Sequence, residues 1–352
     1  MARKVLDIFD TARISDDAVR VIGYHGGPDA KLPDKLHGML VREIGRDAFA
    51  GQKELRTITI PEGVETIRAG AFADCVGLET IALPATVTLG EEGAFVRCVG
   101  LKRIETAAEN SHYRSLDGIL FDRRGKVLCC YPAGRQELTY ALPVGVNAIA
   151  PQAFSWCSAL QKVVLTPALE WIGESAFAYC VMLQEIDIPH GVAGIDACAF
   201  MACGRLTAVR MPGTLTTLGP EAFSGCSQLA QVVVSCMLTR IEDGVFRNCA
   251  RLPVIELSES LVELGDAAFA GCSSLNGINL PVRLERIGDE TFRDCVALRS
   301  LEIPPGVKRV GLNAFTGCKH LTVIADKDSA AYQAAKRDHV HRRSTGRALS
   351  RL

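Results

Sequence analysis

Cysteine is the residue type here with the widest chemistry, because a thiolate can bind a metal, form a disulfide or attack an electrophile. The chain of 352 residues contains fourteen cysteines. Ten of them each lie three residues after a phenylalanine: Cys75, Cys98, Cys157, Cys180, Cys203, Cys226, Cys249, Cys272, Cys295 and Cys318. A metal or redox site needs ligands that converge on one point, which a regular spacing of 23 residues does not provide. The pattern favours a buried ladder of reduced thiols, with disulfides or a metal as the alternatives.

The remaining cysteines form no recognisable reactive motif. Cys129 and Cys130 are adjacent, so we expect them on opposite faces of a strand and without shared chemistry. Cys198 and Cys236 have no His or Asp partner at a motif spacing. The sequence also lacks HExxH, GxSxG and a glycine-rich phosphate loop. We therefore predict no catalytic residues, no cofactor and no metal, with a catalytic site assembled across distant segments as the alternative.

Positive charge gathers at the C-terminal end of the sequence. The basic residues from position 336 onward include Lys336, Arg337, Arg342, Arg343, Arg347 and Arg351, with His339 and His341 among them. Such a tail can contact RNA, DNA or another anionic surface. We favour a solvated, frayed terminus, since chain ends without buried residues are usually poorly ordered. The two histidines are likewise expected to be solvated rather than a metal-binding pair.

Composition indicates a folded chain with little net charge. Hydrophobic residues make up 48% and charged residues 22%, which excludes disorder of the whole chain. The 39 basic and 40 acidic residues nearly cancel, so net charge favours neither nucleic acid nor an anionic membrane as partner. Asp7 and Asp10 interrupt the apolar residues of the N-terminus before a signal-peptide core forms, and no stretch approaches membrane-spanning length. We expect a cytoplasmic protein, with the cell surface or secretion by another route as the alternative.

An internal repeat of 23 residues organises the sequence. Eleven of the thirteen phenylalanines belong to it: Phe49, Phe72, Phe95, Phe154, Phe177, Phe200, Phe223, Phe246, Phe269, Phe292 and Phe315. A leucine follows each of them by six residues, and an Ile, Val or Leu follows that leucine by three. The unit reads I-G-x-x-A-F-x-x-C-x-x-L-x-x-I-x-I-P-x-x-V. Phe9 lies outside this register, and we expect truncation of its ring to cost little stability.

Each part of the repeat predicts a local structure. The last two apolar residues of L-x-x-I-x-I point to one side of an extended strand, and proline then ends that strand. The I-G-x-x-A-F-x-x-C segment has apolar residues at roughly helical spacing, which predicts a short helical or 3₁₀ turn on the other side. A lone coil would gain roughly 10–18 kcal/mol from burial and lose roughly 23–46 kcal/mol of backbone entropy. The coils must therefore stack into a solenoid.

The A-F-x-x-C-x-x-L-x-x-I-x-I-P motif, present over about residues 40–326, resembles that of the BspA-like leucine-rich repeats. The resemblance implies an α/β repeat solenoid shaped as a horseshoe or arc. One parallel β-sheet would form one side, and short helical or irregular segments the other. The resemblance also implies a relation to bacterial and protist proteins, many of which are surface-exposed and implicated in adhesion to host or matrix proteins. A surface adhesin is therefore an alternative to a general protein-binding scaffold.

Three segments depart from the plain repeat: the N-terminal end, one insertion and the C-terminal end. We predict a β-rich N-terminal cap over residues 1–44, the solenoid over residues 45–326, and a capping helix followed by the basic tail over residues 327–352. The register breaks once, and the inserted segment covers about residues 107–137. Two strand-like runs there flank Arg123-Arg124-Gly125, which predicts a β-hairpin carried on an extra coil.

Two surfaces are candidates for binding a protein ligand. The first is the outward face of the strands, where the charged residues are Arg103, Glu105, Lys162, Glu185, Asp187, Arg210, Glu256 and Glu302. It contains no aromatic residue and is therefore a poor hot-spot surface. The second is the hairpin region, with Tyr113, Phe121, Arg123, Arg124 and Tyr131, because insertions into repeats are often binding loops. A hairpin that only covers neighbouring coils is the alternative, and we predict a non-enzymatic interaction scaffold whose ligand the sequence does not identify.

Overall fold

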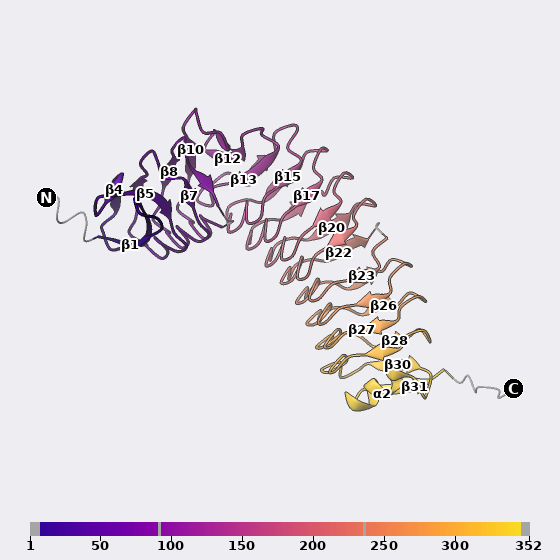
Figure 1. Ribbon diagram of the computed structural model, residues 1–352. Helices are drawn as coiled ribbons and strands as arrows, with labels where there is room; N and C mark the ends of the chain where they lie inside the picture. Colours follow the sequence, from indigo (N-terminus) through magenta and orange to yellow (C-terminus); the bar gives the residue numbers. More distant parts are fainter. Residues whose placement is uncertain (1–7, 91–92, 235–236, 346–352) are drawn as a thin grey trace. The chain divides into compact units, whose positions relative to one another are not determined.

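The structure, a computed structural model, describes residues 8–90, 93–234 and 237–345. Contacts divide the chain into two compact units, each built from stacked coils (Figure 1). Unit 1 contains the residues up to 137 together with residues 145–159, and unit 2 contains residues 138–144 and those from 160 onward. Each regular coil crosses two lines of short parallel strands. We call the line formed by L-x-x-I-x-I the first line, and the other the second line.

The strands of unit 1 begin with antiparallel pairs and continue in parallel. Its first line contains β3 (Asp29–Lys31), β6 (Thr57–Thr59), β8 (Thr80–Leu83) and β10 (Arg103–Thr106). Its second line contains β2 (Ala18–Tyr24), β5 (Met39–Ile44), β7 (Thr66–Ile67) and β9 (Thr88–Leu89). At the N-terminal end β1 (Phe9–Arg13) lies antiparallel to β2, and β4 (Lys35–Leu36) lies antiparallel to β5.

The inserted segment of unit 1 forms the predicted hairpin and one further strand. β11 (Tyr113–Leu116) and β12 (Ile119–Asp122) are antiparallel, as are β12 and β13 (Val127–Cys130). β13 then pairs in parallel with β15 (Ala148–Ile149). The hairpin is therefore built into the second line of strands, and only its turn projects.

Unit 2 repeats the same two lines. Its first line contains β14 (Thr139–Ala141), β16 (Lys162–Val164), β18 (Glu185–Ile186), β20 (Ala208–Met211), β22 (Gln231–Val234), β24 (Val254–Glu256), β26 (Gly277–Asn279), β28 (Ser300–Glu302) and β30 (Thr322–Ala325). Its second line contains β17 (Trp171–Ile172), β19 (Gly194–Ile195), β21 (Thr217–Leu218), β23 (Arg240–Ile241), β25 (Glu263–Leu264), β27 (Arg286–Ile287) and β29 (Arg309–Val310). Two lines of strands, rather than one sheet, therefore frame the coils.

The turn side of the coils is not helical, so the α/β description needs correction. Two residues per coil adopt the left-handed conformation; around Phe246 they are Gly244 (φ 63°) and Asn248 (φ 59°). A left-handed residue on each side of the phenylalanine prevents a continuous α-helix. The Phe246 N–H instead donates to the Ala268 carbonyl of the next coil at 2.9 Å. The described chain is thus a β-solenoid with irregular turns, and within its described ranges the only α-helix is α2 (Ala330–Arg337).

The phenylalanines of the repeat form stacked columns inside the coils. In unit 2 the rings of Phe177, Phe200 and Phe223 are 5.1 and 5.2 Å apart and nearly parallel. Phe9 was expected to matter little, and that prediction is wrong. Its side chain is only 3% exposed and packs against Phe49, with ring centroids 6.4 Å apart. Phe9 therefore extends the column of unit 1 at its N-terminal end.

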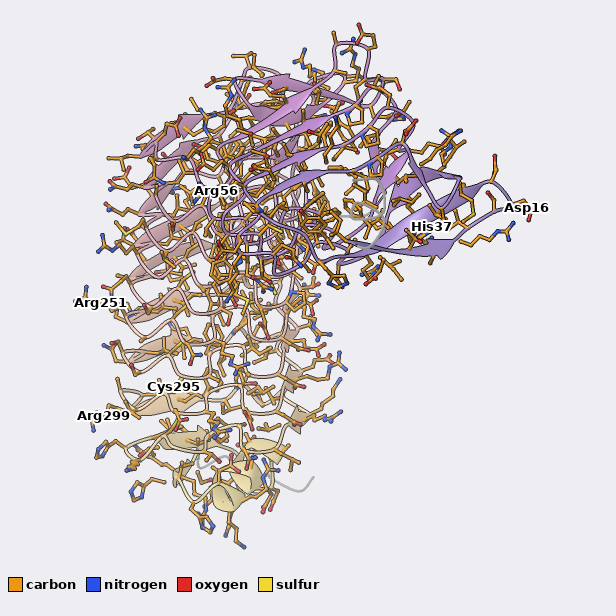
Figure 2. The ribbon with its side chains drawn as sticks, turned by 90° about the vertical axis from the view of Figure 1, so that its left-hand side faces the viewer. Asp16, His37, Arg56, Arg251, Cys295 and Arg299 are labelled. Atoms are coloured by element: carbon orange, nitrogen blue, oxygen red, sulfur yellow. The ribbon has the colours of Figure 1, made fainter. Side chains whose placement is uncertain are left out.

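The predicted cysteine ladder lies beside the phenylalanine column and is buried. Most of these thiols donate to the carbonyl of the phenylalanine in the preceding coil, as Cys226 does to Phe200 at 3.2 Å. Figure 2 shows Cys295 inside the coils of unit 2, whereas Arg251 and Arg299 project from them. Burial disfavours the thiolate and raises the pKa of Cys226 to about 12. The ladder thiols are therefore packing groups and weak hydrogen-bond donors.

The C-terminal end of unit 2 is more ordered than predicted. The capping helix α2 is present, and Ser329 caps it by accepting from the Tyr332 N–H at 3.2 Å. Residues of the predicted frayed tail form β31 (His341–Ser344), which pairs in parallel with β30. Arg342 also lies over the Tyr332 ring at 5.5 Å. Arg347 and Arg351 of the tail lie outside the described residues.

Truncation of a ring within the column should be severely destabilising. Phe223 is fully buried between Phe200 and Phe246, so Phe223→Ala is expected to lower the free energy of unfolding by about 3–5 kcal/mol. The control is Leu312→Ala, since that side chain is 59% exposed. Urea denaturation followed by circular dichroism measures both, and similar small shifts for the two variants would contradict the packing described here.

The buried thiols predict a loss of stability in alkali. The folded-state pKa of Cys226 is raised, so its contribution is complete below the unfolded value near 9 and is lost as pH rises towards 12. In that window one such thiol contributes a slope of about 1.4 kcal/mol per pH unit. Cys226→Ala should therefore show a shallower fall in unfolding free energy between pH 9 and 11 than the native chain. Equal slopes in Cys226→Ala and the native chain would show that this thiol ionises as readily in the folded as in the unfolded state.

Candidate functional site

The outward face of the first line in unit 2 presents charged side chains to solvent. Lys162 and Glu185 pair with each other, with Nζ and Oε2 2.7 Å apart. This pairing raises the pKa of Lys162 and lowers that of Glu185. Four other exposed candidates make no hydrogen bond or ion pair through their side chains within the described residues: Asp187, Arg210, Glu256 and Glu302. These four are available to an external partner.

The same face is hollowed where prolines end the strands. One hollow of about 420 Å³ is lined by Lys162, Val164 and Asp187, and another of about 430 Å³ is lined by Val282 and Glu302. Val164 is 47% exposed and Val282 is 71% exposed. The sequence analysis selected only charged residues of this face. The structure shows that Val164 and Val282 are exposed beside them.

The hairpin turn of unit 1 holds two arginines outward. The Asp122 carboxylate accepts from the backbone N–H groups of Arg124 (3.2 Å), Lys126 (2.6 Å) and Val127 (2.7 Å). These bonds fix the turn, and the exposed side chains of Arg123 and Arg124 make no ion pair within the described part of the chain. The turn is therefore a compact basic tip.

The aromatic residues proposed for the hairpin surface are not on the surface. Phe121 is 1% exposed and Tyr131 is 2% exposed, because both point into the core of unit 1. Tyr131 takes the place of the missing repeat phenylalanine: its ring stacks on Phe154 at 5.2 Å, and its carbonyl accepts from the Cys157 thiol. Tyr113 is half-buried, and its hydroxyl accepts from the Leu89 N–H at 3.1 Å. The rings of Phe121 and Tyr131 therefore cannot form a hot spot on the hairpin surface.

Arg103 and Glu105 belong to a charged network rather than to a free strand face. Their side chains form an ion pair of 2.7 Å, and Arg103 also lies 3.9 Å from Asp117. Arg135 bridges Asp117 (3.0 Å) and Glu137 (2.7 Å) and stacks over Tyr131. Burial alone would raise the pKa of Glu137, but the hydrogen bonds it accepts, including those from Arg135, lower it. This network fastens the inserted segment to its own unit.

Cys129 and Cys130 were expected on opposite faces, and the structure contradicts this. Leu120 pairs with Cys130 whereas Phe121 pairs with Leu128, so Cys129 is the extra residue of a β-bulge. Both half-buried thiols consequently line one cavity of unit 1. Burial raises the pKa of each to about 12. They are neutral thiols at physiological pH.

No cluster of three or more His, Cys, Asp and Glu side chains suited to a metal ion occurs within residues 8–90, 93–234 and 237–345. Over the same ranges, no helix has the length and apolar character needed to cross a bilayer.

Comparison with known proteins places the repeat in a family. The model of the BspA type leucine rich repeat region matches residues 36–117, 138–253 and 239–331, and leaves out residues 118–137. A leucine-rich repeat protein from Eubacterium ventriosum shares the fold, with TM-score 0.58, 17% identity, and 88% of this chain and 92% of that one covered. A leucine rich cell surface protein from Faecalibacterium prausnitzii has TM-score 0.53 and 21% identity, covering 97% and 94%.

No curated protein matches the sequence. The family model, however, covers well over half of the chain, and the coils that it matches are those in which the buried Phe, Cys and Leu recur. The chain therefore belongs to the family of BspA-type leucine-rich repeat proteins.

Proposed function

We propose that this protein is a non-enzymatic scaffold that binds another protein through the outward face of the first strand line in unit 2. The observation that carries the proposal is a set of exposed charged side chains there that form no hydrogen bond or ion pair within the described residues: Asp187, Arg210, Glu256 and Glu302. An exposed charge that already forms an ion pair contributes little binding free energy to a complex. An unpaired charge can form a new ion pair when a partner binds.

Apolar contacts can accompany these charges. Val164 and Val254 are 47% and 50% exposed and occupy outward strand positions that carry polar residues in other coils. A surface of separated valines and mixed charge lacks the aromatic anchors of tight interfaces. We therefore expect recognition to depend on an extended contact along several coils, with modest energy from each residue.

The basic tip formed by Arg123 and Arg124 is a second candidate contact, because a fixed turn presents both guanidinium groups at little entropic cost. An acidic segment of a protein partner would complement it. One neighbour of known structure is described as a cell surface protein, which supports including an extracellular protein among the possible ligands.

Charge reversal on the strand face should separate this surface from others. The variant Arg210→Glu is expected to weaken binding of any captured partner by about tenfold, since one attraction becomes a repulsion. The control is Arg247→Glu, which makes the same change in net charge at an exposed position on the turn side. Partners captured from bacterial lysate and from extracellular matrix protein mixtures would be identified by mass spectrometry and their affinities measured with purified components.

A third variant, Arg123→Glu/Arg124→Glu, tests the hairpin tip. Loss of binding in the strand-face variant alone supports the proposal. Loss in the tip variant alone, or equal loss in the strand-face and control variants, contradicts it.

A further inference from the structure

Trp171 is an exposed aromatic side chain on the second strand line of unit 2. It belongs to β17 and is 39% exposed, whereas the next residue, Ile172, points into the core. The outward positions of the following two strands carry Gly194 and Thr217, so the three residues form one row across the sheet. Among the outward second-line positions that the structure describes in unit 2, Trp171 is the one aromatic residue. Single exposed apolar residues are common, so the geometry around this ring decides whether it has a function.

The indole of Trp171 lies flat on the strand that follows it. A Cβ added at Gly194 would collide with three consecutive atoms of the six-membered ring, Cε3, Cζ3 and Cη2, at nearly equal distances. A point above the face of a ring is about equally near to neighbouring ring atoms, whereas a point beyond the edge of a ring is not. One face of the indole therefore covers Gly194, which is buried although it occupies an outward position. The opposite face of the ring is turned to solvent.

Gly194 and Asp196 hold the ring in this orientation. Glycine is unfavourable within a strand and often marks a place where another group approaches closely, which here is the indole. The φ angle of Gly194 is not in the left-handed region, so the backbone itself does not require glycine. The indole Nε1 donates to Asp196 Oδ2 at 2.8 Å. A ring that is fixed in this way can receive a ligand at little cost in side-chain entropy.

The surroundings of the ring within unit 2 are acidic. The strands β17, β19 and β21, together with the four residues after each of them, contain acidic residues but no lysine or arginine. Within the described residues, Asp196 Oδ1 accepts no hydrogen bond and is not enclosed by protein atoms. Glu170 and Glu174 are exposed, and over the same ranges their side chains form no hydrogen bond or ion pair. Arg240, the next basic residue along the row, already lies 3.5 Å from Glu263.

We propose that the exposed face of Trp171 and the carboxylate of Asp196 bind an arginine or lysine side chain of a protein partner. The face of an indole ring has a negative potential that attracts a cation placed over it. Asp196 adds a negative charge beside the ring, and its Oδ1 can accept a hydrogen bond from the bound guanidinium or ammonium group. A neutral partner would contact the ring but would dehydrate the carboxylate without compensation. The site lies on the second strand line, so this proposal and the first-line proposal above can fail independently.

The test measures, by isothermal titration calorimetry, the affinity of the full chain for the peptide Gly-Ser-Arg-Ser-Arg-Ser-Gly and for its analogue with citrulline, a neutral isostere, in place of arginine. The arginine peptide is expected to bind saturably and more tightly than the citrulline peptide. Trp171→Thr should lower affinity for the arginine peptide about 3- to 10-fold. Gly194→Thr keeps the indole but forces it off the strand, so it should cause a similar loss. Asp196→Asn keeps an acceptor for Nε1 and removes the charge, so it should weaken binding of the arginine peptide alone.

The matched control for Asp196→Asn is Asp328→Asn, which removes an exposed carboxylate elsewhere in unit 2 and should leave affinity for the arginine peptide unchanged. Thermal unfolding checks that each variant is folded. Trp171→Phe keeps an aromatic face and should bind the arginine peptide more tightly than Trp171→Thr, which separates loss of the ring from loss of stability.

Three results would overturn the proposal. The first is that the arginine peptide does not bind, or binds no more tightly than the citrulline peptide. The second is that neither Trp171→Thr nor Gly194→Thr changes its affinity. The third is an equal loss of affinity in Asp196→Asn and Asp328→Asn, because it would show non-specific attraction to acidic residues.

Discussion

The stacking of one buried phenylalanine on the next is the constraint on which the rest of this molecule depends. A ring spacing of 5.1–6.0 Å between Phe177, Phe200, Phe223 and Phe246 requires successive coils to keep the same length and path. That requirement fixes the period of 23 residues. It also favours a small residue before the phenylalanine, which is alanine in nine of the eleven repeats, and a thiol three residues after it, which is present in ten. A cysteine satisfies that last position because it is small and apolar, and its S–H can donate to a carbonyl that would otherwise lie unpaired beside the rings.

The insertion shows how the column tolerates an interruption. Tyr131 resumes the stack on Phe154, and its hydroxyl reaches Glu137 at the edge of the core. Arg135 then connects Glu137 to Asp117, so the tyrosine exchanges a purely apolar contact for a link to the surface. Stacking of Tyr131 on Phe154 restores the regular coils that follow, but it leaves a space between the coil of Phe95 and that of Tyr131. This space is the cavity lined by Cys129 and Cys130.

Sequence alone predicted the strands, the buried positions and the hairpin, and it missed the conformation of the turns and the geometry of the insertion. The sequence predicted the strand residues and the buried Phe, Cys and Leu positions because they follow a repeated pattern. It predicted the hairpin because the turn has a strong sequence signal. The helical turns were wrong because apolar spacing does not reveal left-handed residues such as Asn248. Cys129 and Cys130 were misplaced because a β-bulge leaves no mark on a single strand.

The same constraint separates the parts of the chain that can change from those that cannot. Residues facing the column are bound to their neighbours on both sides, so a substitution in one coil disturbs the stacking of the next. Outward residues such as Arg210 and Glu256 are exposed to solvent, so they can vary independently in each coil. The inserted segment is constrained differently from both groups. Its length need not equal 23 residues, but its two ends must join the neighbouring coils of the solenoid. New chemistry is therefore most easily accommodated at such an interruption, where the fold leaves space that it does not itself fill.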